Sequence, residues 1–293
     1  MARRIKFKMW QIVLLPLVAG VLLQVVLGPV RWEFFAWPVN LIVLILLLSA
    51  IGAMYALRKK VCLFEWMMHF GAAVPCLICA AALTIVMGLI PQVHEDGMPW
   101  LSQMLRFWPF VLVWTWMMII SALASLNHLL RWKVKEIPFV LNHLGVVVAI
   151  VAATLGSADM QRLQLTAFTG EPEWRAVDDE GTVFEPGLTI YLHKFTLEEY
   201  EDHSPKRFAS EITVCTDDGK TVRGTVEVNR PLKVNGWKIY QYGYDVQYGA
   251  ESPYSVFKLV RDPWILWVYI GIFMMIAGAV CLMLFMAPKP VKE

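Results

Sequence analysis

The 293-residue sequence is poor in charge, because only 17% of it is Asp, Glu, Lys or Arg while 58% is hydrophobic. Soluble domains carry about a quarter charged residues, so this composition excludes an ordinary soluble protein. Six stretches lack all four charged residue types and exceed the about 20 helical residues that cross a bilayer. They are residues 9–30, 34–57, 66–93, 107–130, 137–158 and 263–288. We predict a polytopic α-helical membrane protein with six transmembrane helices.

Basic residues gather at one set of helix ends. Twelve basic and three acidic residues lie in the segments "MARRIKFK", "LRKKVCLFE", "RWKVKE" and "PKPVKE". The opposite loops, around Arg31–Glu33 and His94–Arg106, hold two basic and three acidic residues. Lys and Arg near helix ends stay in the cytoplasm. We therefore expect both termini inside, a location in the inner (cytoplasmic) membrane, and residues 159–262 on the periplasmic, extracytoplasmic side. No small-residue cleavage site follows the first stretch, which argues against a signal peptide.

Residues 159–262 differ in kind from the rest of the chain. They hold eighteen acidic and twelve basic residues, which argues against a nucleic-acid partner. Apolar and polar residues alternate, as in β-strands, in "RLQLTAFT", "LTIYLHKF", "SEITVCT", "TVRGTVEV" and "WKIYQYGY". Gly in "TDDGK" and "VNGW" is typical of hairpin turns. We predict an extracytoplasmic all-β domain between helices five and six, with residues 1–158 as the five-helix region and 263–293 as the last helix and cytoplasmic tail.

Cysteine is also scarce, with five residues in the chain. Residues 159–262 contain only Cys215, so no disulfide forms within them. Cys76 and Cys79 have the spacing of a redox or metal-binding pair. They lie near the middle of an apolar stretch that disfavours the thiolate, and no second pair completes a zinc site. We interpret them as small helix-packing residues; a membrane thiol or quinone oxidoreductase is the alternative.

Three ionisable side chains lie inside the predicted spans, and all three are His. At about 1.5 Å rise per residue, His69 and His128 lie within roughly 5 Å of the basic border, where a His can reach water or headgroups, and His143 lies roughly 10 Å deep. An ionisable residue at that depth indicates a functional site, and imidazole is a standard iron ligand of haem. A neutral His143 bonded to Asn142 or to a carbonyl of a neighbouring helix is the structural alternative.

Three segments resemble the ResB-like (CcsB) family of cytochrome c biogenesis proteins. The first is "LNHLGVVVAIVAATLGSADMQRLQLTAFTGE", in which a His-bearing membrane helix runs into the first strand of a β-domain. The second is "VEVNRPLKVNGWKIYQYGYD", residues 226–245, and the third is "RDPWILWVYIGIFMMIAGAV". Together they cover roughly residues 137–288. The chain departs from the family in having four helices before the His-bearing one, and Trp264 where many members have Gly.

The resemblance implies a subunit of the System II machinery, which carries haem (haem b in transit) across the membrane for attachment to apocytochrome c. His143 matches the family's membrane His, so it is the expected iron ligand, and His69 and His128 are further candidates for haem binding. The chain has no "WWD" segment, so a CcsA-type synthetase is the expected partner, beside membrane lipid, apocytochrome c and a thiol-reducing thioredoxin-like protein. We expect no catalytic residue. A non-enzymatic scaffold with a structural His143 and a partner-docking β-domain is the second alternative.

Overall fold

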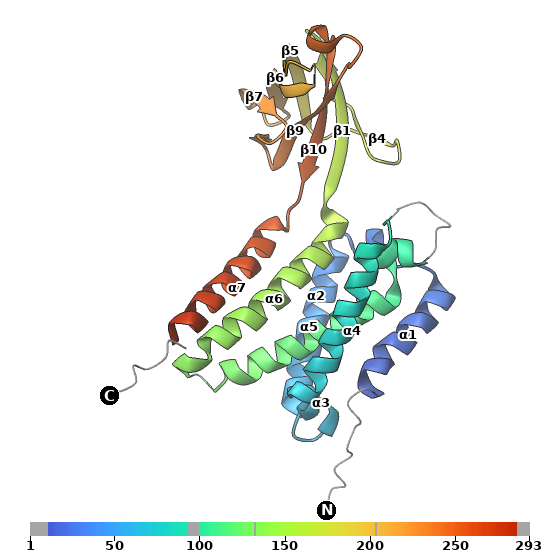
Figure 1. Ribbon diagram of the computed structural model, residues 1–293, viewed down its shortest axis with the longest axis vertical. Helices are drawn as coiled ribbons and strands as arrows, with labels where there is room; N and C mark the ends of the chain where they lie inside the picture. Colours follow the sequence, from blue (N-terminus) through green and yellow to red (C-terminus); the bar gives the residue numbers. More distant parts are fainter. Residues whose placement is uncertain (1–10, 93–99, 132, 203, 286–293) are drawn as a thin grey trace, which may run out of the picture. The chain divides into compact units, whose positions relative to one another are not determined.

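The computed structural model describes residues 11–92, 100–131, 133–202 and 204–285. The chain forms two compact units (Figure 1). One, here called the membrane unit, comprises Met1–Ala158 and Trp264–Glu293 and is helical. The other, here called the β-domain, comprises Asp159–Pro263. The basic segments at the two termini, on which part of the predicted orientation rests, lie outside the described residues.

Among the described residues, five helical segments of the membrane unit are long and apolar enough to cross a membrane. They contain the helices α2 (Val39–Leu57), α4 (Phe70–Leu89), α5 (Trp108–Leu129), α6 (Ile137–Gly156) and α7 (Ile265–Phe285). Each coincides with a stretch predicted from the lack of charge, so five of the six predicted helices are confirmed. Helix α1 (Gln11–Leu27) is shorter, with 17 residues, and the predicted stretch begins before the described part of the chain.

Helix α5 is the centre of the membrane unit, because it packs against α1, α2, α4 and α6 (Figure 1). Its buried face carries apolar side chains such as Val113, Met118 and Leu123. Cys76 of α4 packs in the same core, and its thiol donates a long hydrogen bond to the Val113 carbonyl, with 3.8 Å between Sγ and O. Core packing is the role predicted for this cysteine.

Helices α6 and α7 cross at glycines and lie side by side in Figure 1. A Cβ atom added to Gly145 would lie 2.7 Å from the Gly271 carbonyl oxygen, and one added to Gly271 would lie 2.6 Å from the backbone nitrogen of Ala149. Small residues allow such close backbone approach between helices in a membrane. Helix α6, which carries His143, is therefore fixed against the helix that ends the described chain.

The β-domain consists of two antiparallel sheets packed face to face. Sheet A has the order β4-β3-β1-β10-β9-β8 and sheet B the order β2-β5-β6-β7. The strands of sheet A are β1 (Gln161–Phe168), β3 (Ala176–Val177), β4 (Val183–Phe184), β8 (Leu232–Val234), β9 (Trp237–Tyr244) and β10 (Tyr254–Arg261). Those of sheet B are β2 (Pro172–Glu173), β5 (Leu188–Glu199), β6 (Pro205–Thr216) and β7 (Thr221–Glu227). The all-β prediction is confirmed, including the five strands read from alternation.

Alternating side chains of both sheets form a single buried core. Leu163 and Leu165 of β1 and Phe257 of β10 meet Ile190 of β5 and Ile212 of β6 in it. Along β1 and β10 each inward residue is separated from the next by one outward residue, which is the period of a half-buried strand. The core also contains one polar pair, because the Oγ atoms of Ser210 and Ser255 lie 2.8 Å apart and both residues are buried. This hydrogen bond ties β6 to β10 across the two sheets.

Two predicted turns have the backbone that their sequences indicate. Asn235 and Gly236 join β8 to β9 with φ values of 47° and 82°, and Val234 pairs directly with Trp237. This is a two-residue hairpin in which both central residues need positive φ, a conformation that Asn and Gly tolerate best. Gly219, in the turn between β6 and β7, has a φ of 83°.

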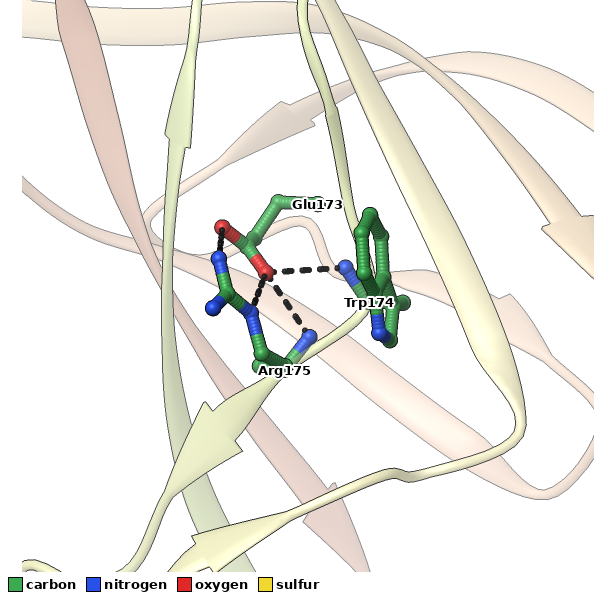
Figure 2. Close-up of polar contacts among 3 residues, drawn as sticks. All are labelled: Glu173, Trp174 and Arg175. Carbon is green, nitrogen blue, oxygen red and sulfur yellow. Dashed lines mark hydrogen bonds and ion pairs between the residues drawn. The ribbon is translucent and has the colours of Figure 1, made fainter.

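The connection between β2 and β3 is held by one carboxylate (Figure 2). An oxygen of Glu173 accepts hydrogen bonds from the backbone nitrogens of Trp174 and Arg175, at 3.1 and 2.9 Å, and from Nε of Arg175 at 3.0 Å. Burial raises the pKa of Glu173, but the hydrogen bonds from Arg175 and Trp174 outweigh it and hold that pKa below its ordinary value. The Trp174 ring is left 45% exposed beside this carboxylate.

The glycine crossing gives the first testable prediction. In Gly271→Ala the new methyl group would overlap the backbone of α6, so the two helices must separate. Overpacking of this kind costs about 1–3 kcal/mol, and we expect a lower thermal midpoint for the detergent-purified protein. Gly52→Ala in α2 is the matched control, because an added Cβ there meets no atom within 4 Å. An unchanged midpoint in Gly271→Ala would contradict the close contact.

Candidate ligand-binding pocket

The ends of α2 and α5 and the starts of α4 and α6 lie together, and basic residues follow α2 and α5. Helix α2 ends at Leu57 and is followed by Arg58, Lys59 and Lys60. Helix α5 ends at Leu129, close to the start of α6. The short helix α3 (Cys62–Trp66) and the start of α4 complete this end of the membrane unit. Pro138 in the first turn of α6 suits a helix start, since its ring fixes φ and that turn needs no amide donor.

A pocket of about 750 Å³ lies between these helix ends. This volume falls in the range of about 300–1,000 Å³ that is usual for sites of small molecules and cofactors. Its lining comes from α2, α5, the start of α4 and the segments between them. The lining residues are Tyr55, Arg58, Lys59, Glu65, Met68, His69, Phe70, Asn127, His128, Leu130 and Arg131. The pocket therefore brings together two of the three histidines predicted to bind a cofactor.

The pocket is positively charged. Three cations, Arg58, Lys59 and Arg131, line it together with one carboxylate, Glu65. Among the acidic residues that the structure describes, none forms an ion pair with any of these three cations. The Arg58 guanidinium is held by the Tyr55 carbonyl, 2.6 Å from Nη1, and lies 3.7 Å from the centre of the Tyr55 ring. Such a lining favours an anionic ligand.

His128 is held in one orientation by two neighbours. Its Nδ1 lies 2.8 Å from Oε2 of Glu136, in the 3-10 helix η3 (Val134–Glu136). The centre of its ring lies 4.2 Å from that of Phe139. A carboxylate accepts hydrogen bonds, so Nδ1 carries the hydrogen and a neutral His128 keeps a lone pair on Nε2. Histidines that bind metals commonly have such a carboxylate partner on the other ring nitrogen.

His143 is held in a similar way but lies apart from the pocket lining. Its Nδ1 donates to the carbonyl of Phe139, one turn earlier in α6, with 2.9 Å between the atoms. The His143 and Phe139 ring centres are 3.9 Å apart at an interplanar angle of 20°. The bond leaves Nε2 as the ring's acceptor. The predicted alternative partner, Asn142, instead donates to the Pro138 carbonyl.

Phe139 separates the two rings that it contacts. Two rings cannot both stack on the same face of a third ring at about 4 Å, so His128 and His143 occupy opposite faces of Phe139. The two imidazoles cannot bind one iron atom from opposite sides while Phe139 lies between them. The three histidines thus form a pair at the pocket, His69 with His128, and a single His143 beyond the phenylalanine.

His69 differs from its predicted position. The sequence predicts it one turn inside a span that begins at residue 66, but the chain leaves the helical conformation before α4, and His69 is the extended residue that precedes Phe70. Its carbonyl accepts the backbone N–H of Ala72. Its ring is exposed and has no hydrogen-bond partner among the described residues. The break itself, residues 67–69, contains no Gly or Pro, and Gly71 follows it inside α4.

The Cys76–Cys79 pair and several tryptophans lie away from the pocket. Cys79 is half-buried in α4 with a free thiol, and no cluster of three His, Cys, Asp or Glu able to hold a metal occurs in the part of the chain that is described. The indole N–H groups of Trp114 and Trp116 are buried, and neither has a partner among the described residues. These tryptophans do not line the pocket, and Trp108 donates to the Gly28 carbonyl at 3.0 Å.

Comparison with known proteins finds relatives for the segment that begins just after the pocket residues. The model of the ResB-like family matches residues 133–252, which include Glu136, Phe139 and His143. Two curated relatives named cytochrome c biogenesis protein CcsB, from Prochlorococcus marinus strains NATL1A and NATL2A, are each 29% identical over 102 residues. This aligned region is 35% of the present chain and 23% of each relative, so the chain spans about a quarter of their length. The predicted resemblance is confirmed: from residue 133 to residue 252 the chain is similar to the ResB-like family.

Proposed function

We propose that this protein is a ResB-like subunit of a System II cytochrome c maturation machinery. In this proposal it binds haem b within its membrane unit and helps deliver it across the membrane for attachment to apocytochrome c, together with a CcsA-type synthetase. The family match over residues 133–252 and the name shared by the two relatives support this role. Haem is the cargo of the protein, and the chain supplies ligands and a path for it.

His143 carries the proposal. It lies in the matched segment, on a helix long and apolar enough to span a membrane, and its Nδ1 bond to the Phe139 carbonyl leaves the Nε2 lone pair unused. An ionisable side chain in such a helix is costly unless it has a partner or a use. Imidazole is a common axial ligand of haem iron. We propose that Nε2 of His143 binds the iron of haem in transit.

The proposed topology has six spans, with both termini in the cytoplasm and the β-domain in the periplasm. It rests on the twelve basic residues at one set of helix ends, against two in the opposite loops. In this orientation, the pocket opens toward the cytoplasm, where haem is made available. The β-domain then faces the compartment in which the synthetase and apocytochrome c meet.

The alternative is a membrane thiol or quinone oxidoreductase that uses Cys76 and Cys79. Both are free thiols on adjacent turns of α4, but Cys76 is fully buried in the helical core. A structural role follows from that burial. If the pair has no redox role, two proposals remain, a haem-binding subunit and a non-enzymatic scaffold. They differ in whether His143 binds iron or is structural.

The test of His143 is its replacement by Ala in cells that also make the partner synthetase. Loss of an iron ligand should weaken haem binding at His143 by at least about tenfold, since loss of even a group that supports a metal ligand costs that much. Added imidazole fits the vacated space and should restore part of the haem and of cytochrome c maturation. Leu144→Ala, one residue along the same helix, is the control. Normal maturation and an unchanged haem spectrum in His143→Ala would remove the proposed role.

Topology is tested with reporter fusions. A phosphatase inserted at Gly219, in the turn between β6 and β7, should be active because that enzyme needs the periplasm. A fluorescent reporter that folds only in the cytoplasm should be bright when fused after Pro290. The reverse pattern would place the β-domain in the cytoplasm and overturn the proposed direction of haem delivery.

The thiol alternative is tested by the double change Cys76→Ala and Cys79→Ala. We expect cytochrome c maturation close to that of the unchanged protein, because Ala fills most of the same buried space and no thiol is needed. Each single variant is made as well, since Cys76 is the more buried of the two. Lost maturation at a normal protein level would favour the redox reading instead.

A further inference from the structure

We infer that the pocket at the basic helix ends is a separate haem site, in which Glu136 positions His128 as the iron ligand and the three cations receive the haem propionates. The inference rests on the proposed function for the identity of the ligand. The proposed site is new in its location. All eleven lining residues precede residue 133, where the family match begins.

The lining selects the class of ligand. Arg58, Lys59 and Arg131 favour an anion, whereas Met68 and Phe70, beside them, favour an apolar surface. A ligand that satisfies both sets is amphipathic, with carboxylate or phosphate groups at one edge. A porphyrin with two propionates has this character, as does an anionic lipid headgroup with its acyl chains.

The His128 imidazole favours the porphyrin over the lipid headgroup. A phosphate headgroup binds donors, and a neutral His128 that donates Nδ1–H to Glu136 offers it only an acceptor at Nε2. A metal ion binds this lone pair directly. In a neutral His128, the bond to the Glu136 carboxylate places the hydrogen on Nδ1 and the lone pair on Nε2. The arrangement is that of a metal-ligating histidine with its carboxylate partner.

The His128 ring is also held before any ligand arrives. Its Nδ1 edge bonds Glu136, and one of its faces lies against Phe139. Glu136 and Phe139 do not line the pocket, whereas His128 does, so the ring joins the two regions. A side chain held in this way loses little rotational freedom when it binds. His69, with no side-chain partner among the described residues, lacks that support and is the weaker candidate for the second axial position.

The experiment compares two porphyrins that differ only in the metal. Ferric haem and metal-free protoporphyrin are titrated into the purified full-length protein in detergent, and binding is followed by absorbance and tryptophan quenching. His128→Ala and Glu136→Ala should weaken ferric haem binding at the pocket by about tenfold or more, so that the remaining spectrum of imidazole-bound iron is that of haem at His143. Both variants should bind metal-free protoporphyrin as the unchanged protein does, which also shows that they are folded. His69→Ala should weaken ferric haem binding less than His128→Ala.

Conservative and charge variants sharpen the assignment. Glu136→Asp keeps the carboxylate and should retain more ferric haem than Glu136→Ala. Arg131→Gln should weaken both porphyrins, by up to about fivefold, because exposed ion pairs contribute at most about 1 kcal/mol. Lys135→Gln is the matched control, since Lys135 is an exposed cation near Glu136 that does not line the pocket.

Equal loss of both porphyrins in His128→Ala, or unchanged ferric haem binding in His128→Ala and Glu136→Ala, would overturn the iron-ligand assignment. Failure of the proposed function is separate, because it is read from cytochrome c maturation in His143→Ala cells. The pocket assignment is read from porphyrin binding by purified protein in which His143 is unchanged.

Discussion

An imidazole among apolar helices needs a partner, and the local structure around His128 and His143 follows from that requirement. Lipid offers no hydrogen bonds, so a polar ring inside a span is stabilised only by groups that the protein supplies. His128 receives a carboxylate from η3, and His143 receives a backbone carbonyl from its own helix. In both cases the bond engages Nδ1 and leaves Nε2 as an acceptor. The same requirement that stabilises the rings also prepares them to bind a metal.

Much of the fold could be predicted from the distribution of charge and of apolar residues. Five spans and five strands lie where the sequence places them, because a lack of charge and a period of two are local properties. Strand β10 was missed, although it is central in sheet A. Its inward residues Phe257 and Leu259 alternate with Val256 and Val260, so both faces are partly apolar and the alternation is weak.

The candidate site was harder to predict, because it depends on contacts between segments distant in the chain. The stacking of Phe139 on His143 follows from a separation of four residues on one helix. The pocket does not follow in this way, since Tyr55, His69 and His128 come from three different helix ends. The break before α4, which frees His69 from its helix, contains no Gly or Pro, and Gly71 comes after it in α4 itself. Sequence reasoning separated His69 and His128, near the basic border, from the deeper His143, but it could not show that the first two line one pocket.

The two units are joined by chain segments that are neighbours at each end. Within the membrane unit, Gly156 at the end of α6 packs against the Trp264 side chain just before α7. Within the β-domain, Gln161 at the start of β1 pairs with Arg261 at the end of β10. A domain whose first and last residues meet can be inserted into a host protein, or removed from it, with little disturbance of either part. The β-domain thus has the ends of a removable module, and a short turn between Ala158 and Trp264 would preserve the α6–α7 pair without it.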